Sequence, residues 1–224
     1  MSLNADLLLL LVIGIDLFIG STGRLGARIR ACALQGLVLA ALPLAIQGTG
    51  VLTGGERVLH TVLAVLATLL LKAVAIPYFL MRAMRQSGVQ REAEPEHSLH
   101  LSLLLCAVLV GLSFWISAVM LPPPEAGSSP LGVPAGLATL LVGLYLTVGG
   151  RTELTQVIGY LVLENGVFVI GQRVLGEFPL VVELGVLLDV LVAVMLMAVL
   201  VAFGHRQDPS AAGNGAATPV GGAR

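Results

Sequence analysis

Charged residues are scarce in this chain, at 11% of 224 residues, and aromatic residues make up only 4%. Soluble globular domains ordinarily carry about 25% charged residues, so this composition argues against that class. The net charge of −1 argues against nucleic acid as a partner, because nucleic-acid binding needs a concentrated basic face. Apolar residues instead make up 57% of the chain.

Cysteine is also rare. Cys32 and Cys106 both lie in apolar runs, and a disulfide or metal site would need more cysteines or nearby ligands. We expect both thiols to pack as small apolar groups. His60 and His100 have no second ligand at a helical spacing, and no haem, zinc, dinucleotide or phosphate-loop signature occurs. The sequence therefore predicts no metal site and no cofactor in this chain.

Apolar runs long enough to cross a bilayer recur along the sequence, which is typical of a polytopic helical membrane protein. We predict an all-α transmembrane bundle with about seven spans. A four-helix region is expected over residues 1–121, a three-helix region over 131–203 and a disordered, Gly-rich tail over 207–224. The expected spans are 3–20, 31–46 (a short one), 58–81, 99–121, 131–148, 156–171 and 179–203.

Arginine is distributed unevenly between the connections. The odd-numbered connections and the tail hold nine arginines, whereas the opposite loops hold only Arg57 and Arg173. The excess marks the cytoplasmic side, so we predict an N-terminus outside and a C-terminus in the cytoplasm. The nine are Arg24, Arg28, Arg30, Arg82, Arg85, Arg91, Arg151, Arg206 and Arg224.

Four ionisable residues lie well inside predicted spans: Lys72, Glu164, Glu183 and Asp189. Glu164 and Asp189 are near the middle of their helices, roughly 15 Å from the nearer membrane surface. A charge at that depth costs at least about 2.5–3.5 kcal/mol, and such residues normally face a bundle interior or a water-filled cavity. We predict that the four residues form a proton pathway. The alternative is that the acids stay protonated and only hold helices together.

Neighbouring residues refine this prediction. Pro77 has no N–H for the carbonyl of Ala73 and should kink the helix that carries Lys72, although the long lysine stem could instead snorkel to the interface. Gly159 and Gly166 are seven residues apart, so they share a face that allows close helix packing, and Asn165 can hydrogen-bond across helices. Gly132 and Gly136 have the same potential for close packing.

The spacing and position of the remaining polar residues bear on their roles. Glu183 and Asp189 are six residues apart and point about 120° away from each other, which fits separate proton stations better than one metal site. Asp16 lies within one turn of the end of its helix, near Arg24 and Arg28, and could simply pair there. Gln35 is a milder polar intrusion into an apolar span.

Several stretches resemble the family of hydrogenase-4 component E. The set is RLGARIRACALQGLVL, then LLLKAVAIPYFLMR with its lysine and proline, then IGYLVLENG, then FPLVVELGVLLD, so the likeness runs from about residue 17 to about residue 203. The resemblance implies a non-catalytic subunit in the membrane arm of complex I-related, group 4 [NiFe]-hydrogenase-like assemblies. It also implies a bacterial or archaeal cytoplasmic membrane, with iron–sulfur clusters and nickel–iron on partner subunits.

The C-terminal three helices are similar to the K subunit of respiratory complex I and to the C subunit of multisubunit cation/proton antiporters. This likeness implies that Glu164 and Asp189 belong to a chain of polar residues along a membrane arm. The pattern departs in one respect. The K subunit has its glutamate four residues before an asparagine, whereas here Leu161 occupies that place and Glu164 directly precedes Asn165. Cation/proton exchange and a structural spacer between larger subunits remain alternative functions.

Overall fold

The computed structural model describes residues 2–47, 66, 69–87, 99–120, 129–174 and 194. These residues form helices and no strand, so the predicted all-α class is confirmed for this part of the chain. The helices are α1 (Ser2–Ser21), α2 (Leu25–Gln47), the π-helix η2 (Leu69–Ala75) continuing into α4 (Ile76–Ser87), α5 (Leu99–Met120), α6 (Gly132–Gly149) and α7 (Glu153–Val174).

Five of these helices, α1, α2, α5, α6 and α7, are long and apolar enough to cross a membrane. Large apolar side chains cover their outer faces, and only 11% of the α5 span is buried inside the protein. An apolar exterior is favourable in lipid and unfavourable in water. The chain is therefore a membrane protein. The predicted third span is described only in part, and the predicted seventh, apart from residue 194, lies outside the described residues.

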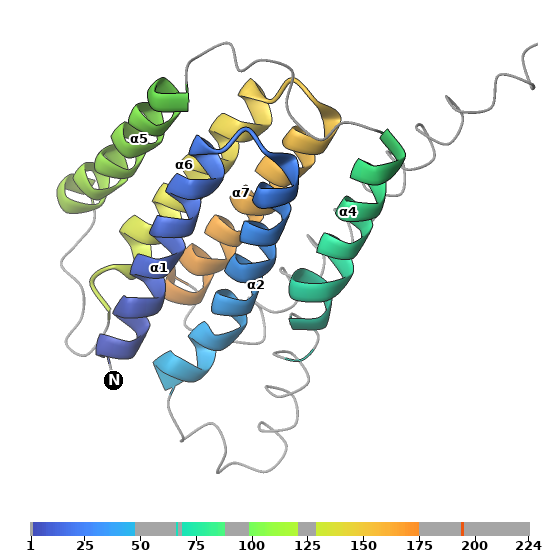
Figure 1. Cartoon of the computed structure of the whole chain (residues 1–224). Coiled ribbons are helices and arrows are strands. Elements are labelled where there is room, and N and C mark those ends of the chain that lie inside the picture. Colours follow the sequence, from blue (N-terminus) through green and yellow to red (C-terminus); the bar gives the residue numbers. More distant parts are fainter. Residues whose placement is uncertain are drawn as a thin grey trace, which may run out of the picture.

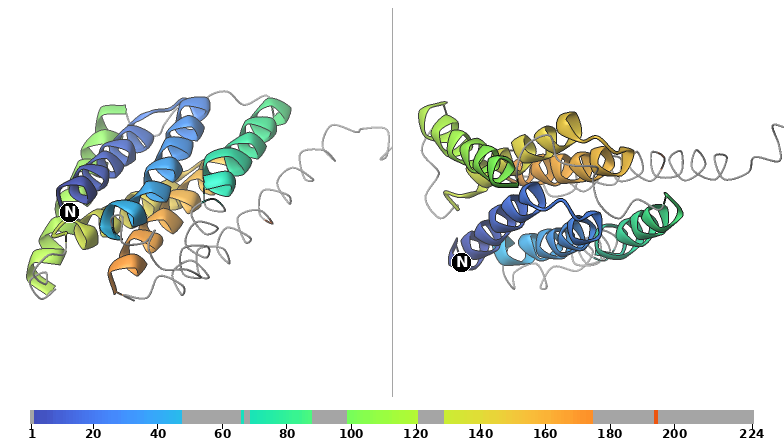
Figure 2. Two further views of the ribbon diagram at one scale, coloured as in Figure 1. Left: turned by 90° about the horizontal axis from the view of Figure 1, so that it is seen from below. Right: turned by 45° about the horizontal axis from the view of Figure 1, so that its top comes forward.

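The helices form two layers that face each other (Figure 2, right). One layer holds α1, α2, η2 and α4, and the other holds α5, α6 and α7; α1 packs on α5 and α6, and α2 packs on α7. Figure 1 shows α1 rising from the N-terminus, α2 returning beside it, and α6 and α7 running in opposite directions. The interface between the layers is where side chains are withdrawn from lipid.

Glycines set the close packing of α6 on α7, as the sequence predicted. A Cβ atom at Gly166 would lie 2.5 Å from the backbone nitrogen of Leu140, and one at Gly159 would overlap the backbone of Thr147. Gly136 meets Ile170 and the carbonyl of Gly166 in the same way. Cβ atoms essentially never approach a backbone this closely, so a larger residue would force the two helices apart.

Helix α2 begins earlier in the chain than the predicted second span. The prediction that the second span is short is wrong, since α2 begins at Leu25 and is 23 residues long. Its first turns include Arg28, which is buried; Nε donates to the carbonyl of Ile19 at 3.1 Å and Nη1 donates to Thr155. The guanidinium thus satisfies a carbonyl at the C-terminal end of α1. Cys32 and Cys106 are free and buried, as predicted.

Candidate functional site

An ion pair lies in the interior between the two layers. Nζ of Lys72, on η2, donates to Oε1 of Glu164, on α7, at 2.5 Å, and both side chains are buried. Because Lys72 is buried and paired with Glu164, the alternative in which its side chain snorkels to the membrane surface is wrong. Lys72 is the only lysine in the chain. Burying two charges is costly unless they meet with good geometry and further hydrogen bonds, and Lys72 has these.

The backbone around Lys72 is unusual. Residues 69–75 form a π-helix, and Pro77, which has no backbone N–H, follows at the start of α4. Such π-segments occur frequently at functional sites, and the predicted kink at Pro77 stays a prediction. Gly36 allows α2 to lie against the same place, because a Cβ there would be 2.9 Å from Cβ of Lys72. The backbone of η2 and a glycine on α2 together position the ammonium group.

Two residues of α7 complete the surroundings of the ammonium group. Oδ1 of Asn165 accepts a hydrogen bond from Nζ at 3.1 Å. The ring of Phe168 lies with its centroid 5.6 Å from Nζ, within range of a cation–π interaction. The predicted ability of Asn165 to hydrogen-bond across helices is confirmed. Glu164, Asn165 and Phe168 thus present a carboxylate, an amide and an aromatic face to one lysine.

Asn165 also connects the ion pair to a second buried carboxylate. Its Nδ2 donates to Oε1 of Gln35 at 3.2 Å, and Nε2 of Gln35 donates to Oδ1 of Asp16 at 2.8 Å. Oγ1 of Thr139 lies 2.6 Å from Oδ2 of Asp16 and completes the row. Asp16 is on α1, Gln35 on α2 and Thr139 on α6, so four helices and the π-segment contribute to one continuous set of hydrogen bonds.

We call this set the polar chain. None of its side chains is more than 6% exposed, although every helix that carries one of them is mostly apolar. Both carboxylic acids can bind or release a proton, lysine can donate one, and the two amides orient their neighbours without changing charge. The arrangement can hold protons inside the membrane. Its members, in order of contact, are Glu164, Lys72, Asn165, Gln35, Asp16 and Thr139.

The sequence interpretation found one half of this site. It selected Lys72, Glu164 and Asn165, which the structure brings together, and it underestimated Asp16 and Gln35. The Asp16 carboxylate accepts hydrogen bonds from Gln35 and Thr139, so the predicted pairing with Arg24 or Arg28 is wrong. Thr139 was missed, since a lone threonine in an apolar helix carries no special signal. A better signal was available for the other two, because an acid and an amide each interrupt a long apolar run.

Two other predicted members of the pathway, Glu183 and Asp189, lie outside the described residues. Their place in the pathway stays a prediction. Within the described part of the chain, no three His, Cys, Asp or Glu side chains gather as ligands for a metal ion.

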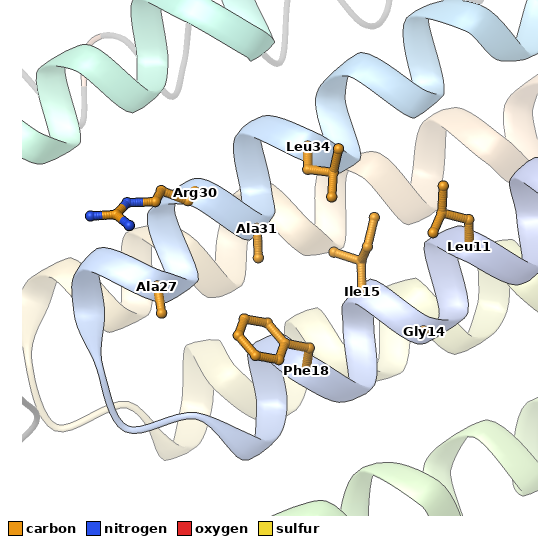
Figure 3. Close-up of a pocket in the computed structure, with 8 residues that line it drawn as sticks. All are labelled: Leu11, Gly14, Ile15, Phe18, Ala27, Arg30, Ala31 and Leu34. Carbon is orange, nitrogen blue, oxygen red and sulfur yellow. The ribbon is translucent and has the colours of Figure 1, made fainter.

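A separate groove runs between α1 and α2 on the outer surface (Figure 3). It has a volume of about 420 Å³ and an almost wholly apolar lining, with the guanidinium of Arg30 at its edge. No member of the polar chain lines it, and Figure 3 shows Phe18 and Ile15 of α1 facing Ala31 of α2 across it. The groove is therefore distinct from the buried site.

Comparison with known proteins places the chain in a family. It is 35% identical over 177 residues to Uncharacterized protein Rv0085 of Mycobacterium tuberculosis, and the match covers 79% of this chain and 77% of the relative. The chain belongs to the Rv0085 family. No protein-family model matches it, and no solved structure matches it.

The Rv0085 family member described here is also similar to proteins with an informative name. It is 31% identical over 97 residues to Hydrogenase-4 component E of Escherichia coli K12, and a protein of the same name in Shigella flexneri matches equally well. The match covers 43% of this chain and 44% of the relative. The chain thus spans less than half the length of the hydrogenase-4 components that it matches.

Proposed function

We propose that this chain is a non-catalytic membrane subunit of a complex I-like or hydrogenase-4-like respiratory assembly. Its buried ionisable residues would take part in proton translocation that is driven by redox chemistry on other subunits. The observation that carries the proposal is the ion pair between Lys72 and Glu164, held inside a membrane protein by a continuous polar chain. The partial likeness to hydrogenase-4 component E supports the choice of assembly.

The chemistry follows from the contacts of Lys72. When Glu164 is ionised, its carboxylate holds the ammonium group at 2.5 Å. When a proton binds to Glu164, the charge attraction is lost, and the hydrogen bond to Asn165 at 3.1 Å becomes the main polar contact of Lys72 in the polar chain. Release of the proton restores the pair. Each cycle moves one proton onto and off the carboxylate, and the ammonium group responds by a shift between two acceptors.

The π-segment gives Lys72 a backbone suited to such a shift. A π-helix has i→i+5 hydrogen bonds where an α-helix has i→i+4, and Pro77 removes a donor two residues after the π-segment. A local exchange between π and α geometry would change the position of the Lys72 side chain. Interaction with partner subunits could drive that exchange. The ion pair would thus be the point at which distant redox energy acts on a proton site.

The complete pathway would extend beyond the described residues. Asp189, with Glu183 on the outer side, would continue it into the predicted seventh span. We expect seven spans, with the N-terminus outside and the C-terminus in the cytoplasm of a bacterial or archaeal cell. Iron–sulfur clusters and nickel–iron would be held by hydrophilic partner subunits.

The partners test this proposal. The tagged full-length chain would be purified from its own membranes in mild detergent, and the proteins that accompany it would be identified by mass spectrometry. Large antiporter-like subunits together with an iron–sulfur or nickel-containing arm would support the redox assembly. Antiporter-like subunits alone, with sodium-dependent transport, would replace it with cation/proton exchange. The chain recovered by itself would contradict both.

A further inference from the structure

A second buried carboxylate, Asp16, is not needed for the ion pair described above. It is completely buried on α1, and both of its oxygens are engaged, Oδ1 by Gln35 and Oδ2 by Thr139. A carboxylate that only held helices together would need hydrogen-bond partners for one charge state. The partners of Asp16 can satisfy both its ionised and its protonated form.

The hydroxyl of Thr139 lies within hydrogen-bond distance of two oxygen atoms. Oγ1 lies 2.6 Å from Oδ2 of Asp16 and 2.9 Å from the carbonyl oxygen of Ala135. A hydroxyl has one hydrogen and can donate to only one of these oxygens at a time. If Asp16 is ionised, Thr139 donates to it. If Asp16 is protonated, Asp16 donates to Thr139, and Thr139 donates to Ala135. The site accepts both forms of the acid through one hydroxyl rotation.

Charged and titratable groups reach Asp16 from several helices. Lys72 and Glu164 lie at the other end of the bridge made by Gln35 and Asn165. In the described part of the chain, the other charged or titratable groups near Asp16 are Arg28 and Cys32 on α2 and Cys106 on α5. When Arg28, Lys72, Asp16 and Glu164 are all ionised, their formal charges sum to zero. Uptake of one proton by an acid then leaves a net charge of +1 in this region.

We propose that Asp16 is a second proton-binding site in the membrane interior, and that the amides of Gln35 and Asn165 couple its occupancy to the Lys72–Glu164 pair. A proton from water binds to Oδ2, an O–H bond forms, and the hydrogen of Thr139 turns to Ala135. Release to water reverses each step. Gln35 donates more strongly to the ionised acid than to the neutral one, so the charge of Asp16 alters the alignment of both amides. The proposal rests on the proposed function for its biological use.

Infrared spectroscopy of the full-length chain in lipid bilayers tests this directly, because a protonated carboxyl group has its own C=O stretching band. We expect a band that grows and disappears as pH is changed and that is lost in Asp16→Asn. Asp6→Asn is the matched control, since Asp6 is on the same helix but bonds to Ser129 outside the polar chain. If Asp16→Asn does not fold, Thr139→Val should keep the band but displace its titration.

Coupling has its own measurement. Glu164→Gln removes the carboxylate paired with Lys72, so the ionised form of Asp16 is favoured and its band should titrate at more acidic pH. Adding Gln35→Leu should reduce this displacement. A band unchanged by Asp16→Asn would overturn the proton site, and an equal displacement with and without Gln35 would overturn the coupling. A band that behaves as expected in an assembly that moves no protons would leave this inference intact and reject the proposed function.

Discussion

The side chain of Asn165 donates to Oε1 of Gln35 at 3.2 Å while its own oxygen accepts from Lys72 at 3.1 Å. One amide plane thus fixes two bonds that cross the interface between the helix layers. Movement of either Gln35 or Lys72 away from Asn165 breaks one of these bonds. The polar chain should therefore respond as a unit, and substitutions within it should have non-additive effects.

A double-mutant cycle would measure the ion pair. Removal of one partner of a buried pair costs about 3–5 kcal/mol, because the other charge is left without compensation. We expect Lys72→Met to lower the free energy of unfolding by about this amount. The double variant Lys72→Met/Glu164→Gln should lose less than the sum of the single variants, as measured by denaturation in detergent. Strictly additive losses would show that the two side chains do not interact.

Chemical modification would test the burial of Lys72. Because it is the only lysine, an amine-reactive reagent has one side-chain target, and the N-terminal amine provides an internal control for reagent access. We expect Lys72 to be protected in the folded protein and modified after denaturation, since it is buried and bound to Glu164. Peptide mass spectrometry gives both extents of modification. Equal modification in the two states would mean that the ammonium group reaches the membrane surface.

Gly36 should matter for the position of Lys72. An added Cβ would lie 2.9 Å from Cβ of Lys72 and 3.2 Å from its backbone, so Gly36→Ala should push η2 away from α2. Overpacking of this kind typically costs about 1–3 kcal/mol. Gly14→Ala is the matched control, because nothing lies within 4 Å of an added Cβ there. Thermal unfolding of the two variants in detergent should differ clearly, and equal behaviour would argue against close packing of α2 on η2.

Sequence alone predicted much of the fold and one half of the site. Apolar run lengths gave α1, α5 and α6 almost to the residue, and glycine spacing predicted the close approach at Gly159 and Gly166. The start of α2 was not predicted because its first two turns carry Arg28 and Arg30, and arginines are typical of the loops between spans. The burial of Arg28 involves a carbonyl of α1 and a hydroxyl of α7, and such contacts have no local signal.

The role of Asp16 was missed for a similar reason. Its closeness to the end of a helix suggested an ion pair with Arg24 or Arg28, whereas Asp16 is completely buried and bonds to Gln35 of α2 and Thr139 of α6. Lys72 and Glu164 were identified individually because an ionisable group is costly in an apolar span. That they form a pair depends on how η2 packs beside α7, across a separation of 92 residues in the chain.

The most direct test of a proton-conducting role is proton movement by the intact assembly with and without the Glu164 carboxylate. Redox-driven acidification would be followed in membrane vesicles that contain wild-type chain, Glu164→Gln, or Glu153→Gln as an exposed acid on the same helix. We expect normal assembly in all three, and proton movement reduced to the level of vesicles without the chain in Glu164→Gln alone. Unchanged proton movement in a fully assembled Glu164→Gln complex would contradict the account, and a failure to assemble would show that Glu164 holds the helices together.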